Sequence, residues 1–469
     1  MYGNVLVIGG GIAGIRAALD LAESGVGVVL VETEPVIGGT MAARLSEAGE
    51  TFHVGPGNQV PHPLPVSQHP NIELLTLSDL VSLEGTPGRF VATIRRRARF
   101  VSDACTQCNR CHVACPSVVP NEYQSGLVYR KAIYTPFHGA VPPTYAIDIE
   151  HCLNTPPNYL PCRRCIDVCE DHAIRFDGAL ETVVRREVSA AIVCVGYSLA
   201  DSTPLKEFGY GEQPDILTYM ELERLTSSVG PTGGYLEKIS NEATPENVLY
   251  VIADSSRWSC LCAAAQTDRL VAQGITDITV LHPASTLFGD TFEHFWSTHT
   301  KHPVRLTEGT LDRLAPIEDD MMRAHYRRNG DAAMATQDFD MVVFTTAVQP
   351  SPGLDALAHA LRIDLDDCGF IKRGSPENGM NATTRPGVYA AGCACGPKDV
   401  ADSIAESKAA AIYALRHLDR RREATPLPEL AMGGTEPASS HSTSSSDEIR
   451  GRIERVVVRL MEMGGGSIG

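Results

Sequence analysis

Apolar residues at the start of the chain occur in two short runs separated by a stretch with helical spacing. Residues 4–8 and 26–32 are such runs, and between them residues 12–25 place apolar side chains on one face of a helix. A short apolar run is typical of a buried strand, and strand, helix and strand in this order form a βαβ unit. We therefore predict two parallel strands joined by a helix at the N-terminus.

The same pattern recurs in the second half of the chain. Residues 246–256 predict a strand, residues 263–275 a helix and residues 277–283 another strand, which together form a second βαβ unit. Repeated βαβ units indicate an α/β protein. The other predicted segments are a loop at 50–70, strands at 89–101, 188–198 and 339–351, and strand, turn and long helix over 387–418.

The composition restricts the partners and the location of the protein. The 469 residues include 40 basic and 57 acidic side chains, and a net charge of −17 disfavours binding to nucleic acid or anionic lipid. No stretch approaches about 18 uninterrupted apolar residues, so we expect no insertion into a membrane. No secretory leader precedes the first glycines, so we expect a cytoplasmic protein. In the reducing cytoplasm, 14 cysteines indicate metal or redox chemistry rather than disulfides.

Glycines between the first strand and the first helix form a dinucleotide-binding motif. Gly9, Gly11 and Gly14 have the spacing G-x-G-x-x-G. The first glycine permits a tight turn, the second admits a pyrophosphate, and the third lets helix and strand pack closely. The helix begins with Ile12 and Ala13, and Glu32 ends the second strand. A carboxylate there can accept hydrogen bonds from the ribose of an adenine dinucleotide.

Two later segments favour FAD over a nicotinamide cofactor. Residues 34–41 resemble the loop after the second strand in flavoproteins with two dinucleotide-binding domains. Residues 387–393 resemble the late strand of the same superfamily, where an aspartate usually binds the flavin ribityl chain. We predict one FAD, with further contacts from Gly38, Gly39, Gly196, Gly392, Cys393 in place of that aspartate, Asp399 and Val400.

Eight cysteines in two runs form a ferredoxin-type pattern. The first run, C-x2-C-x2-C-x3-C-P, has the bacterial [4Fe–4S] spacing, whereas zinc sites usually pair two C-x2-C knuckles. In the second run, residues 153–161 separate Cys152 from a C-x2-C-x3-C group, and their prolines and asparagines favour a loop that leaves the ligand set complete. We predict two [4Fe–4S] clusters, one held by Cys105, Cys108, Cys111 and Cys169, the other by Cys115, Cys152, Cys162 and Cys165.

The remaining six cysteines carry weaker signals. Cys194 lies in a predicted buried strand and Cys368 in a predicted turn, and both are most simply structural. Two C-x-C pairs are either small buried residues, a redox-active thiol pair near the flavin, or ligands of a third cluster; they are Cys260 with Cys262 and Cys393 with Cys395.

The second βαβ unit lacks the glycines that a nicotinamide dinucleotide needs. No glycine occurs from Ala253 to Ala265. A pyrophosphate cannot approach such a turn closely. We therefore predict that this unit does not bind NADH or NADPH.

Over about residues 3–418 the chain resembles the A-type subunit of heterodisulfide reductase, the FAD and iron–sulfur component of a methanogen complex and its bacterial relatives. The resemblance covers the glycine motif, the cysteine block inside the flavin domain, and the segments 120–148, 230–234 and 390–407. It implies an oxidoreductase whose flavin exchanges electron pairs and feeds its clusters one electron at a time. The implied partners are B- and C-type subunits, of which the B-type reduces the disulfide, or a ferredoxin-like carrier; a homodimer stays open.

A rival interpretation is a self-contained flavin and iron–sulfur oxidoreductase that acts directly on a small substrate. Turnover by the isolated chain would favour it. In either case no side chain stands out as an acid or base, because the cofactors carry the chemistry.

The predicted fold class is α/β, with the two-dinucleotide-binding fold of thioredoxin-reductase-like flavoproteins and an inserted two-cluster ferredoxin domain of α+β type. The predicted flavin domain is discontinuous, and a second Rossmann-like unit without a glycine fingerprint interrupts it. The predicted parts are flavin domain 1–95, ferredoxin insert 96–180, flavin domain 181–225, second unit 226–352, flavin domain 353–422, and a linker and tail over 423–469.

Overall fold

The structure is a computed structural model that describes residues 4–42, 62–254, 256–283, 286–287, 290–330 and 333–423. Most of the loop predicted at 50–70 and nearly all of the predicted linker and tail lie outside these residues. The described part of the loop contains a short helix, α4 (Leu64–Gln68), which the sequence pattern missed.

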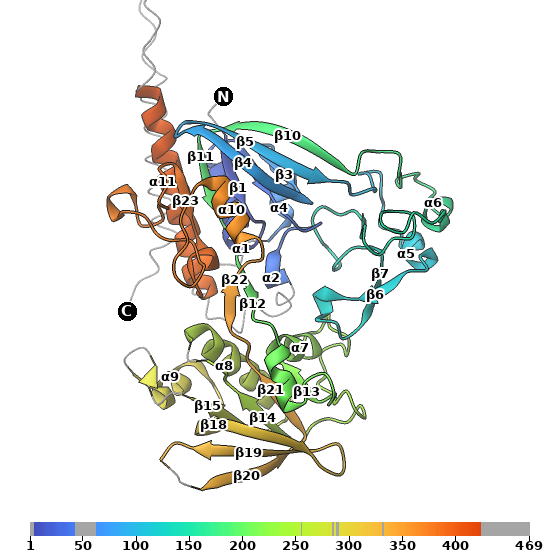
Figure 1. The fold of residues 1–469 in the computed structure, drawn as a ribbon, viewed down its shortest axis with the longest axis vertical. Helices are drawn as coiled ribbons and strands as arrows, with labels where there is room; N and C mark the ends of the chain where they lie inside the picture. The colour runs from blue at the N-terminus through green and yellow to red at the C-terminus, as the bar shows by residue number, and fades with distance from the viewer. Residues whose placement is uncertain are drawn as a thin grey trace, which may run out of the picture.

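A five-stranded parallel sheet forms the centre of the first unit (Figure 1). Its buried side chains pack on one face against α1 (Ile12–Glu23) and α11 (Val400–Glu423). On the other face they pack against an antiparallel sheet and α10 (Leu354–Leu361). The parallel strands, in spatial order, are β23 (Val388–Ala390), β11 (Ala190–Val193), β1 (Val5–Ile8), β2 (Val28–Val31) and β3 (Ile72–Leu75); the antiparallel strands are β10 (Glu181–Val188), β5 (Arg89–Arg97) and β4 (Ser78–Thr86).

The cysteine-rich block is inserted between β5 and β10. These two strands pair over their whole length, from Phe90 with Val188 to Arg97 with Glu181, so the insert leaves the sheet intact. The insert has a small core of its own, in which Phe100, Tyr145 and Ile174 pack against several cysteines. Its elements are α5 (Arg110–Ala114), α6 (Arg164–Asp167), the 3-10 turn η1 (Glu122–Gln124), and the hairpins β6–β7 (Val118–Pro120, Tyr129–Lys131) and β8–β9 (Ile133–Tyr134, Ala146–Ile147).

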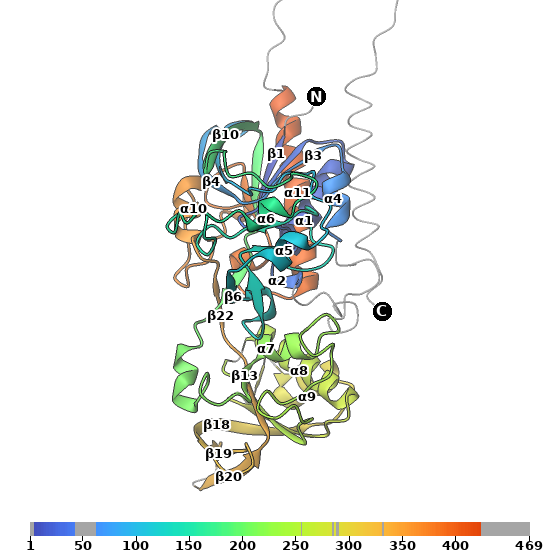
Figure 2. The same cartoon turned by 90° about the vertical axis from the view of Figure 1, so that its right-hand side faces the viewer.

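The second unit lies below the first along the long axis of the molecule (Figures 1 and 2). Its seven-stranded sheet is parallel up to β18 and then continues as an antiparallel meander. The short antiparallel pair β12 (Tyr197–Leu199) and β22 (Val348–Pro350) connects the units. The sheet order is β13 (Ile216–Thr218), β21 (Met341–Phe344), β14 (Asn247–Val251), β15 (Asp277–His282), β18 (Arg305–Pro316), β19 (Met322–Arg328) and β20 (Met334–Phe339); the helices are α7 (Tyr219–Leu225), α8 (Arg257–Ala272) and α9 (Phe292–His299).

The predicted α/β class, with two units each built on parallel strands, is confirmed. One predicted boundary differs from the structure, because residues 216–225 lie in the second unit and not in the flavin domain. There β13 pairs with β21, and Thr218 begins α7 with a capping box to Glu221. None of the described helices combines the length and apolar character that a bilayer crossing requires.

Candidate flavin and iron–sulfur sites

The turn after β1 has no room for side chains at two of its three motif glycines. Gly9 has φ +101°, and a Cβ there would lie 2.4 Å from the carbonyl oxygen of Cys194, the residue that follows β11. A Cβ on Gly14 would lie 1.8 Å from the carbonyl oxygen of Gly9. The glycines therefore let β1, α1 and β11 approach one another closely, as the motif requires.

The remaining motif glycine faces a second glycine loop. Gly11 caps the N-terminus of α1, and a Cβ on Gly39 would lie 3.0 Å from the Cα of Gly11. The amide of Gly38 donates to the carbonyl oxygen of Gly10 over 2.8 Å, which fixes the two loops together. In the first turn of α1, the N–H groups of Ile12 and Ala13 have no acceptor within the helix and favour an anion. Bare backbone and a helix N-terminus fit a dinucleotide pyrophosphate.

Glu32 lies just beyond β2 with both carboxylate oxygens on backbone amides. The amide of Gly10 donates to Oε2 over 2.5 Å and that of Glu34 donates to Oε1 over 2.8 Å. Burial raises the pKa of Glu32 to about 7, although these hydrogen bonds act in the opposite direction. The side chain is thus close to the glycine turn, where the sequence places a ribose acceptor.

The raised pKa of the Glu32 carboxyl contributes to the stability of the FAD-free protein at acid pH. The folded state holds the Glu32 proton more tightly than the unfolded state does. The contribution of Glu32 to the free energy of unfolding is therefore complete below the ordinary pKa near 4.5 and is lost as the pH rises through about 7. We expect Glu32→Gln to lack this pH dependence. Relative to wild type, its free energy of unfolding should be higher by at most about 3 kcal/mol at pH 8 and little changed at pH 5. Thermal melts of both FAD-free proteins across this range provide the measurement, and parallel pH profiles would contradict the expectation.

The late strand β23 brings a further glycine to the start of α1. A Cβ on Gly392, which has φ +70°, would lie 3.1 Å from the Cβ of Ala13. The amide of Gly392 donates to Glu406 of α11 over 3.0 Å, and the Glu406 carboxylate also pairs with Arg373 and Lys398. The Glu406 carboxylate therefore lies next to the backbone of Gly392, the residue before Cys393. Glu406 was not predicted, although it lies in the segment 390–407, because its hydrogen bond to Gly392 depends on how α11 packs.

The other predicted flavin contacts lie around the ends of β11 and α11. Asp399 accepts a hydrogen bond from the amide of Asp402 over 2.7 Å and so caps α11, and Val400 is buried behind it. The Cys393 thiol donates to the carbonyl oxygen of Lys398 over 3.5 Å. Gly196 has φ +71°, and no heavy atom lies within 4 Å of where its Cβ would be.

The eight predicted cluster ligands line two cavities in the insert. The space at one cavity is about 320 Å³ and at the other about 360 Å³, the open solvent at each mouth included. Each is lined by three cysteines of one run and one cysteine of the other run, as the ferredoxin pattern predicts. The smaller cavity is lined by Cys105, Cys108, Cys111 and Cys169, and the larger by Cys115, Cys152, Cys162 and Cys165.

The arrangement of the cysteines around each cavity fits a group larger than a single ion. Within the described ranges, no three or more His, Cys, Asp or Glu side chains are arranged to hold one metal ion. Four thiolates around one zinc ion would lie about 4 Å apart, whereas cysteines that ring a cavity match a multi-iron group. Gln107 and Asn109 have φ of +55° and +66°, so the first cysteine loop adopts an uncommon backbone conformation. The thiol-only ligand sets and apolar walls suit iron–sulfur clusters.

Two of the cavity cysteines, Cys111 and Cys165, hold their protons more tightly than a free thiol does. Burial and neighbouring cysteines raise the pKa of Cys111 to about 11 and that of Cys165 to about 12. Ligation requires thiolates, so loading with iron must release these protons. The amide of Ala173 also lies 3.4 Å from the sulfur of Cys169, and such contacts tune cluster potentials.

The two C-x-C pairs lie in different cores. Cys260 and Cys262 are fully buried in the apolar core of the second unit, near Trp258. Cys395 packs instead against the first unit's sheet.

The insert contacts the segment after β2, residues 34–42, at three points; this segment carries Gly38 and Gly39 and is called the flavin loop below. Arg99 donates to the carbonyl oxygen of Pro35, the amide of Ile37 donates to the carbonyl oxygen of Val141 over 2.9 Å, and the hydroxyl of Tyr123 donates to the carbonyl oxygen of Ala42 over 2.8 Å. Burial lowers the pKa of Arg99 to about 10, so the guanidinium stays charged at neutral pH. These contacts hold the cysteine cavities beside the loop that carries Gly38 and Gly39.

The chain is similar to FAD-dependent oxidoreductases and to subunits of heterodisulfide reductases. Residues 4–73 match the family of FAD-dependent oxidoreductases. The chain is 34% identical to the A-type iron–sulfur subunit of the CoB–CoM heterodisulfide reductase of Methanocaldococcus jannaschii, over 87% of this chain and 63% of the relative. The predicted resemblance to the A-type subunit of heterodisulfide reductase is confirmed. A second relative, the A-type subunit of the ferredoxin:CoB–CoM heterodisulfide reductase of Methanosarcina mazei, is 32% identical over 90% of this chain and 54% of its own length.

The family match supports FAD as the cofactor and an oxidoreductase as the class of protein. The chain spans less than two thirds of the length of both heterodisulfide reductase relatives. Among solved structures, the thioredoxin reductase of Lactococcus lactis aligns with 89% of this chain and 99% of its own, at 13% identity and a TM-score of 0.48.

Proposed function

We propose that this chain is the electron-transfer component of a cytoplasmic heterodisulfide-reductase-like complex. It would bind FAD at the N-terminal glycine motif and two [4Fe–4S] clusters at the two cysteine cavities of the insert over residues 96–180. Bound FAD supplies two-electron chemistry and the clusters supply one-electron chemistry. The chain's own residues bind these groups, exclude water and fix their spacing.

The attachment of the insert to the flavin loop is the observation that carries this proposal. Electron transfer slows steeply with distance, so a converter between electron pairs and single electrons must hold its flavin and clusters close together. Arg99, Ile37 and Tyr123 bind the cysteine-bearing insert to the loop after β2.

The proposed partners are B- and C-type subunits that reduce or oxidise a disulfide or another thiol or sulfur substrate, or a ferredoxin-like carrier. The names of the relatives support this choice, because they describe subunits of heterodisulfide reductases and one includes ferredoxin. The chain itself offers the cofactor sites described above, and the substrate would bind to a partner.

Cofactor content tests the proposal. After anaerobic purification or reconstitution we expect about one FAD and about eight irons per chain, from two four-iron clusters. Flavin absorbance after release, iron and sulfide assays, and elemental analysis give the numbers. Zinc in place of iron, or a colourless protein after careful reconstitution, would rule out the cluster assignment.

A further inference from the structure

The nine residues between Cys152 and Cys162 form a closed knuckle and not a loose loop. Thr155, which is 2% exposed, donates through its hydroxyl to the carbonyl oxygen of Ile149. Asn158 donates to the carbonyl oxygen of Cys152 over 3.0 Å, and the amide of Leu160 donates to the carbonyl oxygen of Leu153 over 2.6 Å. The segment therefore satisfies its own polar groups and closes at its base.

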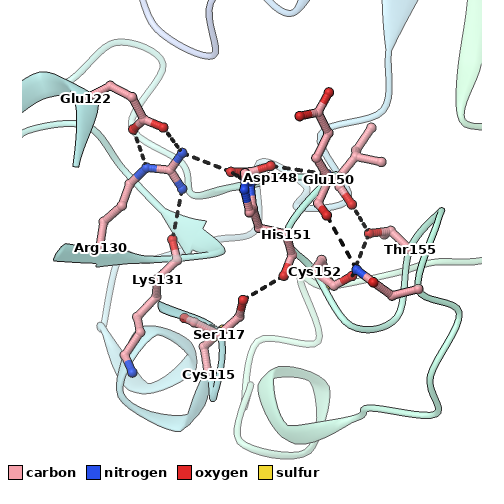
Figure 3. A network of polar contacts seen from close by, with 12 residues as sticks. Cys115, Ser117, Glu122, Arg130, Lys131, Asp148, Glu150, His151, Cys152 and Thr155 are labelled. Carbon is pink, nitrogen blue, oxygen red and sulfur yellow. Dashed lines mark hydrogen bonds and ion pairs between the residues drawn. The ribbon is translucent and has the colours of Figure 1, made fainter. Parts of the chain in front are cut away.

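A buried arginine holds the base of this knuckle in place (Figure 3). Arg130, which is 7% exposed, donates two hydrogen bonds of 2.6 Å to Glu122 and one of 2.9 Å to Asp148. Asp148 pairs in turn with His151 over 2.9 Å, and its carbonyl oxygen accepts from the amide of Cys152 over 3.0 Å. The knuckle thus projects from a rigid network.

The tip of the knuckle exposes large apolar side chains beside the second cavity. Residues 157–161 are all exposed, including Tyr159 at 70% and Leu160 at 54%. Tyr159 has φ +46°, an uncommon backbone conformation for a non-glycine residue that the closed knuckle maintains. Leu153 at the base of the same segment lines the cavity, which places the tip close to the second ligand set. Exposed apolar residues gathered in one place mark binding surfaces.

We propose that Tyr159 and Leu160 form the docking contact for an acidic, ferredoxin-class electron carrier that exchanges one electron at the second cysteine cavity. This inference rests on the proposed function. Arg163 and Arg164, both exposed, follow directly, and Arg163 is only loosely paired with Asp167 at 3.5 Å. Tyrosine and arginine dominate the binding energy of interfaces. The exposed guanidinium groups of Arg163 and Arg164 would orient an acidic carrier toward this cavity.

The step is a single electron transfer. The reduced carrier loses one electron and the acceptor at the second cavity gains it, without a bond or a proton changing place. Interfaces of this kind are small and short-lived. A pre-formed knuckle suits such contact, because little conformational entropy is lost when the carrier binds.

The test uses the loaded full chain and a purified acidic ferredoxin with two [4Fe–4S] clusters as the probe. We expect Tyr159→Ser with Leu160→Ser to weaken binding of the oxidised ferredoxin, measured by titration calorimetry, by about tenfold or more. The second-order rate constant of electron transfer from the reduced ferredoxin should fall by a similar factor. Dithionite should reduce wild type and the double variant at equal rates. Tyr159→Phe should retain the affinity because it keeps the ring.

Tyr235→Ser provides the matched control, since Tyr235 is 75% exposed but lies in the second unit. It should leave ferredoxin affinity unchanged. Unchanged affinity in the double variant, or no ferredoxin binding by wild type that carries its clusters, would overturn the docking proposal. If the double variant lost only the ability to form a homodimer and kept its ferredoxin affinity, the docking proposal would also be overturned. The knuckle would then be a contact between two copies of this chain. Absence of clusters from wild type would instead refute the proposed function, so the two failures are distinguishable.

Discussion

Replacing Cys152 by alanine should halve the iron content of the protein, from about eight to about four atoms per chain. Cys152 lines the larger cavity together with Cys115, Cys162 and Cys165, and its thiol has no substitute among the apolar residues of that wall. The smaller cavity has a separate ligand set and should keep its cluster. Loss of one ligand therefore damages one cluster selectively.

Iron assays and paramagnetic spectra of the reduced protein give the measurement. Cys368→Ala is the matched control, because Cys368 is exposed in a turn outside the insert and should not affect iron. Shortening residues 153–161 to two residues should keep both clusters, since Leu153 and Leu160 already meet through a backbone hydrogen bond of 2.6 Å. Unchanged iron and spectra in Cys152→Ala would show that Cys152 is not a ligand.

Local features of the fold were predictable from the sequence. Each strand–helix–strand unit is encoded by neighbouring residues, so β1, α1 and β2 lie within the predicted ranges, as do β14 and β15. The grouping of the eight cysteines around the two cavities was predictable for the same reason, because the spacing within each cysteine run is a local feature. The meander of β18, β19 and β20 was missed. Its strands are partly exposed and carry charged residues, which removes the continuous apolar signal.

Long-range features were not predictable from the sequence. Glu406 reaches Gly392 from the interior of α11, and Arg99 reaches Pro35 across 64 positions. Arg99 belongs to no motif, and Glu406 lies in the segment 390–407 without being part of the glycine or cysteine patterns. The boundary at 225 was wrong because strand pairing between β13 and β21 assigns residues 216–225 to the second unit, and pairing partners are set by topology rather than by composition.

The turn after β14 is unsuited to a nicotinamide dinucleotide. Asp254 accepts from the amide of Ser256 over 2.9 Å, and the Ser256 hydroxyl accepts from the amide of Ser259 over 3.2 Å, so side chains already cap α8. A carboxylate there also repels a pyrophosphate. Trp258 is buried, with edge contacts to Tyr197 and Tyr219. The obstacle is therefore the missing glycines and the charge of Asp254.

We expect NADH and NADPH to reduce the flavin of the isolated protein slowly and without saturation up to about 1 mM. Micromolar affinity requires about 8 kcal/mol of binding free energy, whereas a dissociation constant of about 1 mM corresponds to about 4 kcal/mol. Without a glycine turn to anchor the pyrophosphate, the dinucleotide loses its main attachment. Reduced ferredoxin should instead bleach the flavin readily, because electrons enter through the insert that Arg99 and Tyr123 hold against the flavin loop. Anaerobic stopped-flow absorbance compares the two donors directly. Rapid reduction that saturates at micromolar NADH would refute this expectation and place the protein among the pyridine-nucleotide oxidoreductases.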